Sequence, residues 1–224
     1  MKILRRKRAQ FAMSVLVAGT VAMSVSTRGL AADDIPKDGL VVWLDAADAA
    51  TIEKDAAGKV SVWKDKSGSG HDAKQEKLEF RPTLAADAMN GKPALQFSKP
   101  DKTRMDLPDL STEKMTWTAV AVVSNPEGGG DRYARIFAAS DGQGYDYEVG
   151  FALSLPLVET GGPRLIASSF KDRWAKSVRV GCFSPAYHTH LHGYVSEIIV
   201  YNRMMTAEEQ KKVKDYLTAK WGLQ

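Results

Sequence analysis

The sequence predicts an all-β fold, an antiparallel β-sandwich with a C-terminal α-helix. The first observation is a series of short apolar or alternating segments, each separated from the next by turn residues. Such segments at regular spacing are typical of sandwiches and jelly rolls. The second observation is that no strand–helix–strand unit repeats along the chain. The third is a single well-capped helical segment at 206–222.

Residues 1–31 have the features of a secretory signal peptide. Basic residues at 2–8 precede an apolar run at 11–25, and small residues follow at 29–32. The apolar run is too short to span a bilayer comfortably, and no other segment is long enough. We therefore expect an exported protein that is periplasmic, cell-surface or secreted, with no membrane span and one domain over 35–224.

The charge of this domain argues against a nucleic-acid partner. The whole chain has a formal net charge of +4, and residues 1–31 carry six basic residues and no acid. The rest of the chain therefore has a net charge of −2. A phosphate-binding basic face is not expected from such a balance.

The predicted strands begin after this leader. In 59–65, Val60 and Val62 face one way and Ser61 and Trp63 the other, and we expect Trp63 to pack against the sheet edge. The other predicted strands lie at 39–46, 93–98, 103–108, 115–124, 133–140, 147–155, 163–169, 177–184 and 193–203.

Cys182 is the single cysteine of the chain, so no intrachain disulfide is possible. It falls within the predicted strand at 177–184. A small buried hydrophobe is the simpler interpretation, because a catalytic thiol would need a base beside it.

The predicted helix has both of its end signals. Thr206 is the expected N-cap, with Glu209 completing a capping box, and Gly222 ends the helix. An apolar stripe at i, i+4 and i+8 is expected to pack on the sandwich: Val213, Leu217 and Trp221. A weaker helical turn is predicted at 46–52.

The segment 63–75, WKDKSGSGHDAKQ, is predicted to be a tight turn between two strands. Gly68 and Gly70 permit positive φ angles. Asp65 and Ser67 can bond to the amides of the turn itself.

Three sequence blocks together resemble a known family. They are GLVVWLDAADAATI (39–52) followed by VSVWKDKSGSGHDA (60–73), RPTL (81–84) with NGKPALQF (90–97), and HGYVSEIIVYNRMMTAEEQKKVKDYLTAKWGL (192–223). In this order they are similar to the laminin G-like, concanavalin A-like jelly-roll domains of bacterial exported proteins. The resemblance covers nearly all of 35–224. It implies the fold, which hosts lectins, adhesion modules, glycosidases and lyases alike.

The resemblance also implies a structural calcium ion near the rim of the sandwich. The acids in the family-like blocks that could supply oxygen ligands are Asp65, Asp72 and Glu197. The alternative is that Asp65 caps a turn and Glu197 forms a surface ion pair.

Two further motifs carry residue types that can support catalysis or metal binding. Glycosidases of this fold place paired carboxylates on a strand as Glu-x-Asp-x-x-Glu, and the chain has no such run. Asp146 and Glu148 come nearest to it. His188, His190 and His192 alternate, so on an extended strand they could bind zinc or copper, although incidental histidines in a loop are the simpler interpretation.

Carbohydrate binding needs aromatic rings and planar polar groups. The middle loops supply candidates: Arg132, Asp141, Tyr145, Tyr147 and Trp174. We expect an exported lectin-like module that binds carbohydrate, with calcium as a possible aid. One alternative is a glycan hydrolase or lyase. The other is a structural or adhesive protein that binds a protein partner.

Overall fold

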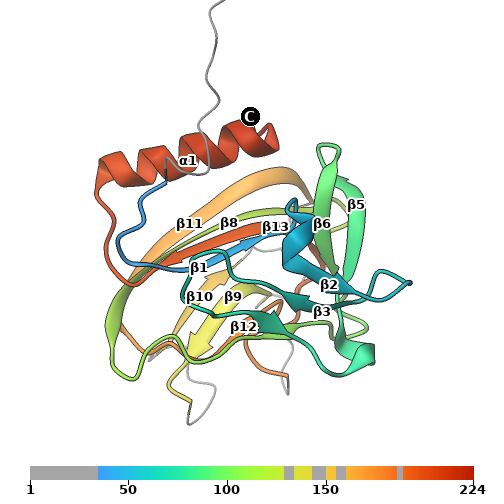
Figure 1. The fold of residues 1–224 in the computed structure, drawn as a ribbon, viewed down its shortest axis with the longest axis horizontal. Coiled ribbons are helices and arrows are strands. Elements are labelled where there is room, and N and C mark those ends of the chain that lie inside the picture. Colours follow the sequence, from blue (N-terminus) through green and yellow to red (C-terminus); the bar gives the residue numbers. More distant parts are fainter. Residues whose placement is uncertain (1–34, 129–133, 143–149, 155–159, 186–188) are drawn as a thin grey trace, which may run out of the picture.

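The computed structural model shows two facing antiparallel sheets and one long helix, α1 (Ala207–Trp221), which confirms the predicted fold class (Figure 1). The helix lies over the outer side of one sheet. None of the described helices is both long and apolar enough to span a bilayer. The structure describes residues 35–128, 134–142, 150–154, 160–185 and 189–224.

The sheet beneath the helix has the strand order β11-β8-β13-β6-β5. β13 pairs with β8 along its length, and its other side is shared between β6 and β1. The strands are β1 (Leu40–Asp45), β5 (Thr83–Met89), β6 (Lys92–Phe97), β8 (Met115–Asn125), β11 (Gly161–Arg173) and β13 (Gly193–Tyr201).

The second sheet has the strand order β10-β9-β12-β7-β4-β3-β2. Its strands are shorter and lie at the lower side of Figure 1. They are β2 (Ile52–Lys54), β3 (Val60–Trp63), β4 (Ala73–Lys74), β7 (Met105–Asp106), β9 (Arg135–Ser140), β10 (Phe151–Ser154) and β12 (Lys176–Val180).

Several predicted elements need correction. The strand predicted at 177–184 ends at Val180, because Gly181 has a φ of +86° and packs so closely that a Cβ would lie 2.3 Å from the Phe97 ring. Cys182 therefore lies beyond the strand, although it is buried as expected, and burial raises the pKa of its thiol to about 12. The strands β2 and β5 were not predicted. The weak helical turn appears as a 3-10 helix at Ala49–Thr51.

The main core lies between the two sheets. Trp63 is fully buried there, so its predicted place at a sheet edge is wrong. The Phe151 ring stacks on Trp117 at 5.5 Å and on Phe170 at 5.0 Å between ring centroids. These aromatic contacts join β10 to β8 and β11 across the sandwich.

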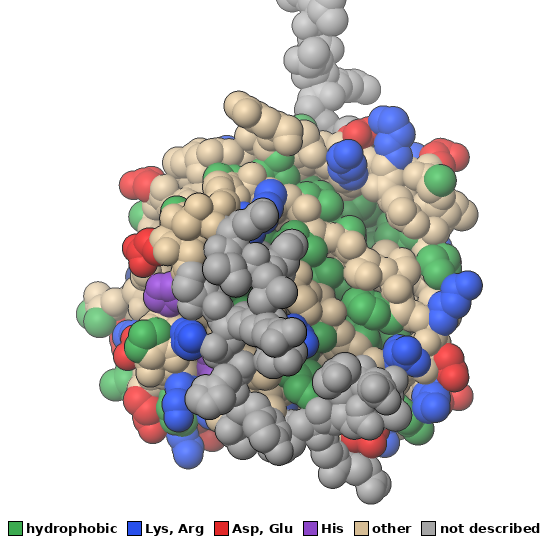
Figure 2. All heavy atoms as spheres, turned by 180° about the vertical axis from the view of Figure 1, so that it is seen from behind, with side chains coloured by type: hydrophobic (Ala, Val, Ile, Leu, Met, Phe, Trp, Pro, Cys, Tyr) green, Lys and Arg blue, Asp and Glu red, His purple; other side chains and the backbone are tan. Residues whose placement is uncertain are grey.

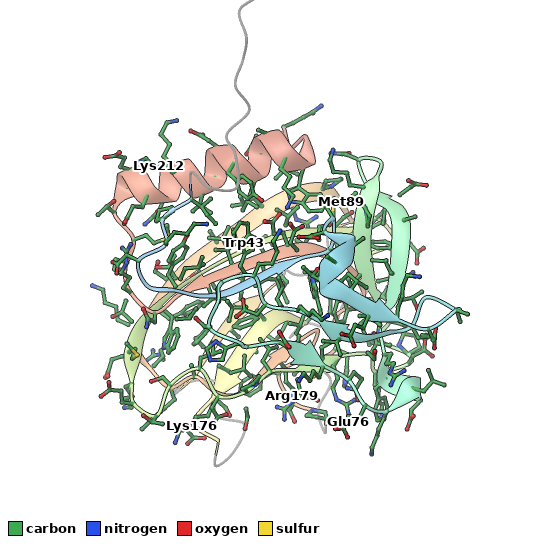
Figure 3. The ribbon with its side chains drawn as sticks, in the orientation of Figure 1. Trp43, Glu76, Met89, Lys176, Arg179 and Lys212 are labelled. Atoms are coloured by element: carbon green, nitrogen blue, oxygen red, sulfur yellow. The ribbon has the colours of Figure 1, made fainter. Side chains whose placement is uncertain are left out.

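A second core lies between the first sheet and α1. Trp43 of β1 and Ile199 of β13 pack against the predicted helical stripe and Tyr216 (Figure 3). The helix has the predicted capping box at Thr206 and Glu209, and Gly222 ends it with a left-handed φ of 61°. Local sequence signals and packing therefore agree on where α1 begins and ends.

Acid is expected to weaken the start of this helix through Glu209. Hydrogen bonds from Arg203 and from the Thr206 amide lower the pKa of Glu209 to about 2, from an ordinary 4.5. A lowered folded-state pKa stabilises the fold above the unfolded value, and this contribution is lost as the pH falls from 4.5 toward 2. The difference in Tm between the wild type and Glu209→Gln should therefore be largest at neutral pH and vanish near pH 2.

Thermal unfolding by circular dichroism across this pH range measures the effect. Glu208→Gln is the matched control, because Glu208 is an exposed first-turn acid whose ion pair with Lys212, at 3.0 Å, is also exposed. A Tm difference for Glu209→Gln that is the same at every pH would contradict the stabilising role assigned to the ionised Glu209 carboxylate.

Candidate functional site

A cleft opens at the end of the sandwich where β6 and β8 finish and β13 begins. Two adjoining hollows form it, a wide one of about 440 Å³ and a narrow one of about 10 Å³, and Glu127 and His192 line both. The wide hollow has a volume typical of small-ligand sites. We call this feature the rim cleft and define it by Gln96, Lys99, Asn125, Glu127, His192 and Tyr194.

Cross-strand pairing places Gln96 beside Tyr194. In β6, Leu95 and Phe97 are buried, and in β13 Val195 is buried, so Gln96 and Tyr194 alternate with core residues. The two residues are direct partners in the ladder, and Gln96 Nε2 donates a hydrogen bond to Tyr194 Oη at 3.3 Å. An aromatic ring and an amide are thereby held together in the narrow hollow of the rim cleft.

His192 and Glu127 form the wall. His192 Nε2 lies 3.5 Å from a Glu127 carboxylate oxygen, and the Lys99 backbone N–H donates to His192 Nδ1 at 3.4 Å. Acceptance at Nδ1 places the proton of a neutral ring on Nε2, facing the carboxylate. Gly193 lets β13 approach β8 here, since a Cβ would lie 2.6 Å from the Ser124 carbonyl oxygen.

The rim cleft combines hydrogen-bonding groups of several kinds with one aromatic ring. Asn125 is fixed by Arg164 Nη2, which donates to its side-chain oxygen at 2.6 Å. Glu127 is the one carboxylate among the described residues that line the rim cleft. Asp146 and Glu148, the nearest approach to a glycosidase pair in the sequence, lie outside the described residues.

The structure confirms that 63–75 contains a tight turn built around Asp65. The Asp65 carboxylate accepts hydrogen bonds from three backbone N–H groups, those of Trp43 (2.8 Å), Ser67 (2.9 Å) and His71 (3.0 Å). Gly68 and Gly70 have φ angles of 91° and 77°, as the turn requires. Asp65 therefore joins this loop to β1.

Glu197 is fully buried between β13 and α1, so its interpretation as a surface ion pair is wrong. Its oxygens accept hydrogen bonds from four side-chain donors: Trp43 Nε1 (2.7 Å), Tyr216 Oη (3.1 Å), Lys220 Nζ (2.7 Å) and Trp221 Nε1 (2.6 Å). Burial, followed by the nearby charge of Asp45, raises the pKa of Glu197.

The predicted calcium ligands are engaged with protein donors. Besides Asp65 and Glu197, Asp72 accepts a hydrogen bond from the Asp65 backbone N–H at 3.0 Å. Within the described parts of the chain, no three His, Cys, Asp or Glu side chains are grouped so as to hold a metal ion. Calcium binding stays a prediction. His188 of the alternating histidines lies outside the described residues, whereas His190 is buried and His192 lines the rim cleft.

The predicted sugar-binding residues are only partly described. Arg132, Tyr145 and Tyr147 lie outside the described residues. Asp141 follows β9, and Trp174 lies in the turn between β11 and β12, with the Lys176 ammonium 4.6 Å from its ring centroid.

Asp141 and Trp174 come to the same edge of the second sheet. Lys176 pairs with Ser140, which places the turn carrying Trp174 beside residue 141. This edge lies at the end of the molecule away from α1 in Figure 3, where Lys176 is labelled. Along β11, residue 161 pairs with Asn125 of the rim cleft, whereas Arg173 pairs with Met115. The Trp174 turn and the rim cleft therefore lie at opposite ends of β11.

Sequence reasoning missed most of the rim cleft. His192 was noticed only as a member of the alternating histidines. The sequence held a signal for two other residues, because alternation in 92–97 and 193–195 places Gln96 and Tyr194 on the face opposite Leu95, Phe97 and Val195. That signal could not reveal that the two residues are ladder partners.

The fold and the rim cleft define an antiparallel β-sandwich protein with a cleft at one end. In sequence, the chain matches no protein-family model and no curated protein. It is similar to the structure of Trypanosoma rangeli sialidase in complex with the inhibitor DANA, at 17% identity and a TM-score of 0.47 over 80% of this chain and 33% of that chain.

A second similar structure is domain 4 of AbnA, a GH43 extracellular arabinanase from Geobacillus stearothermophilus, in complex with arabinotriose. It has 11% identity and a TM-score of 0.48 over 79% of this chain and 98% of that chain. The chain spans about a third of the sialidase. Similarities at this level of identity assign no function to it.

Proposed function

We propose that this protein is an exported, lectin-like binding protein of the laminin G-like class that recognises carbohydrate in the rim cleft. The observation that carries the proposal is the convergence of one aromatic ring with amide, imidazole and carboxylate groups from separate segments of the chain. Glu127, His192 and Lys99 line the wide hollow of about 440 Å³, which is large enough for a sugar unit. Tyr194, Gln96 and Asn125 line the narrow hollow that adjoins it at Glu127 and His192.

The side chains suit the two surfaces of a sugar ring. Tyr194 is half-buried, so its ring can cover the C–H face of a sugar while its body stays fixed by the sheet. Glu127, Gln96 and His192 offer planar acceptors and donors to hydroxyl groups. The sequence resemblance to laminin G-like domains supports the same ligand class.

Calcium remains part of the proposal as a structural aid. The oxygens of Asp65 and Glu197 already accept hydrogen bonds from the protein, so a calcium ion there would have to displace these donors. Chelation is therefore expected to leave carbohydrate binding intact, unless the ion is held by residues outside those described.

A glycan array tests the proposal, with the purified protein applied in calcium and then in chelator. Binding to at least one glycan class is expected in both. Binding that the chelator abolishes would keep carbohydrate recognition and assign calcium a direct part in it. Absence of binding across a broad array would contradict the proposal. Release of reducing ends from polysaccharides during incubation would show an enzyme instead.

A further inference from the structure

A further hollow of about 410 Å³ lies between α1 and the strands β8 and β11. Its floor contains two cross-strand pairs, Val120 with Ala167 and Thr118 with Ser169. Leu165 and Val213 extend the apolar part toward the middle of α1. We call this feature the helix groove. Figure 2 shows hydrophobic side chains exposed on one face, with lysine and arginine side chains around them.

The helix groove is open because only one face of α1 packs closely on the sheet. Val213 and the C-terminal half of the helix seal the core. A second face of α1 overhangs β11 without filling the space below it. The residues on this face follow i, i+3, i+4 and i+7 spacing: Ala207, Gln210, Lys211 and Lys214. The floor on β11 spans 165–169, about 13 Å at the rise of a strand.

The charged side chains that line the helix groove are all positive. Its lining has two lysines, and among the described lining residues there is no acid. Lys211 forms an ion pair with Asp215. Lys214 is exposed, and no carboxylate of the described residues lies within ion-pair distance of it. Within the described parts of the chain, Lys214 therefore has no carboxylate partner and lies at the edge of the helix groove.

We infer that the helix groove binds a single-chain amphiphile with a carboxylate headgroup, of the fatty-acid class. The acyl chain lies along Val120, Leu165 and Ala167, where it covers apolar surface that the helix leaves open. The carboxylate reaches Lys214, whose flexible stem can follow the headgroup. A cationic headgroup would meet the same lysine and be repelled. This inference stands apart from carbohydrate binding in the rim cleft.

Calorimetric titration of the whole protein with dodecanoate, below its micelle concentration, tests the inference. Dodecyltrimethylammonium is the matched ligand, with the same chain and the opposite charge. We expect saturable binding of dodecanoate and at least about tenfold weaker binding of dodecyltrimethylammonium. Lys214 attracts the carboxylate of the first ligand and repels the ammonium group of the second.

Two variants locate the site. Ala167→Trp fills the floor from an exposed strand position and should weaken dodecanoate binding by about tenfold or more, because the chain loses its apolar contact surface. Lys214→Glu should weaken it about fivefold, the range of a surface ion pair. Lys74→Trp, on the exposed side of the second sheet, is the control and should leave binding unchanged.

Equal affinity for both amphiphiles would overturn the headgroup assignment. Dodecanoate binding that survives Ala167→Trp would overturn the location. No binding by the wild type would overturn the inference as a whole.

Discussion

Replacement of Glu197 by alanine is expected to lower the free energy of unfolding by about 3–5 kcal/mol, the range for breaking a buried charged pair. Of its four donors, Trp43 Nε1, Tyr216 Oη and Trp221 Nε1 would lose their acceptor in a buried region, whereas Lys220 Nζ would keep its ion pair with Asp45 at 2.8 Å. Three of these donors belong to α1, so the docking of the helix depends on this carboxylate. Urea unfolding followed by tryptophan fluorescence measures the change.

Glu197→Gln should lie between the wild type and Glu197→Ala. The amide keeps one acceptor oxygen, but its NH₂ group must face donors that the carboxylate satisfied. Glu53→Ala is the matched control: Glu53 forms an exposed ion pair with Lys64 at 2.9 Å, and its loss should change stability by about 1 kcal/mol or less. A Glu197→Ala protein as stable as Glu53→Ala would contradict the role assigned to the buried carboxylate.

Asp65→Ala is expected to destabilise the protein by about 2–4 kcal/mol, because three backbone N–H groups lose a shared acceptor and water replaces it only in part. The Trp43 amide belongs to β1 and the Ser67 and His71 amides to the turn, so the loop should loosen from the sheet. Thermal unfolding measures the loss of stability. Hydrogen exchange at the Trp43 and His71 amides measures how far the loop loosens from β1.

Asp87→Ala is the control for this substitution, since Asp87 is an exposed acid of β5. Its Tm should remain close to that of the wild type. If a chelator lowered the wild-type Tm as much as Asp65→Ala does, the carboxylate would act through calcium and not through the turn alone. An unchanged Tm for Asp65→Ala would contradict the hydrogen-bond account.

The fold was predictable where its signals are local. Thr206 and Glu209 determine where α1 begins, and Gly222 determines where it ends. Each signal lies within one turn of the helix end on which it acts, and all three residues behave as predicted. β5 was missed because its sequence, TLAADAM, has few of the β-branched and aromatic residues that favour strands. β12 was predicted too long because the contact between Gly181 and Phe97 depends on tertiary packing.

The candidate site was harder to predict, because it depends on pairing between distant segments. Gln96 and Tyr194 are 98 residues apart and meet only when β6 and β13 align. Glu197 was placed at the surface because its burial depends on the docking of α1, which brings Tyr216, Lys220 and Trp221 to it. Alternation along a strand shows which side chains face outward, but not which of them become neighbours.

The most direct test of the rim cleft compares the glycan affinity of Tyr194→Ala and Glu127→Gln with that of Trp174→Ala. Tyr194 and Glu127 line the rim cleft, whereas Trp174 carries the aromatic ring at the opposite end of β11. We expect Tyr194→Ala to weaken binding about tenfold or more, in the range for an aromatic contact, and Glu127→Gln to weaken it several-fold. Trp174→Ala should bind as the wild type does. Loss of binding in Trp174→Ala, with Tyr194→Ala unaffected, would contradict carbohydrate recognition in the rim cleft.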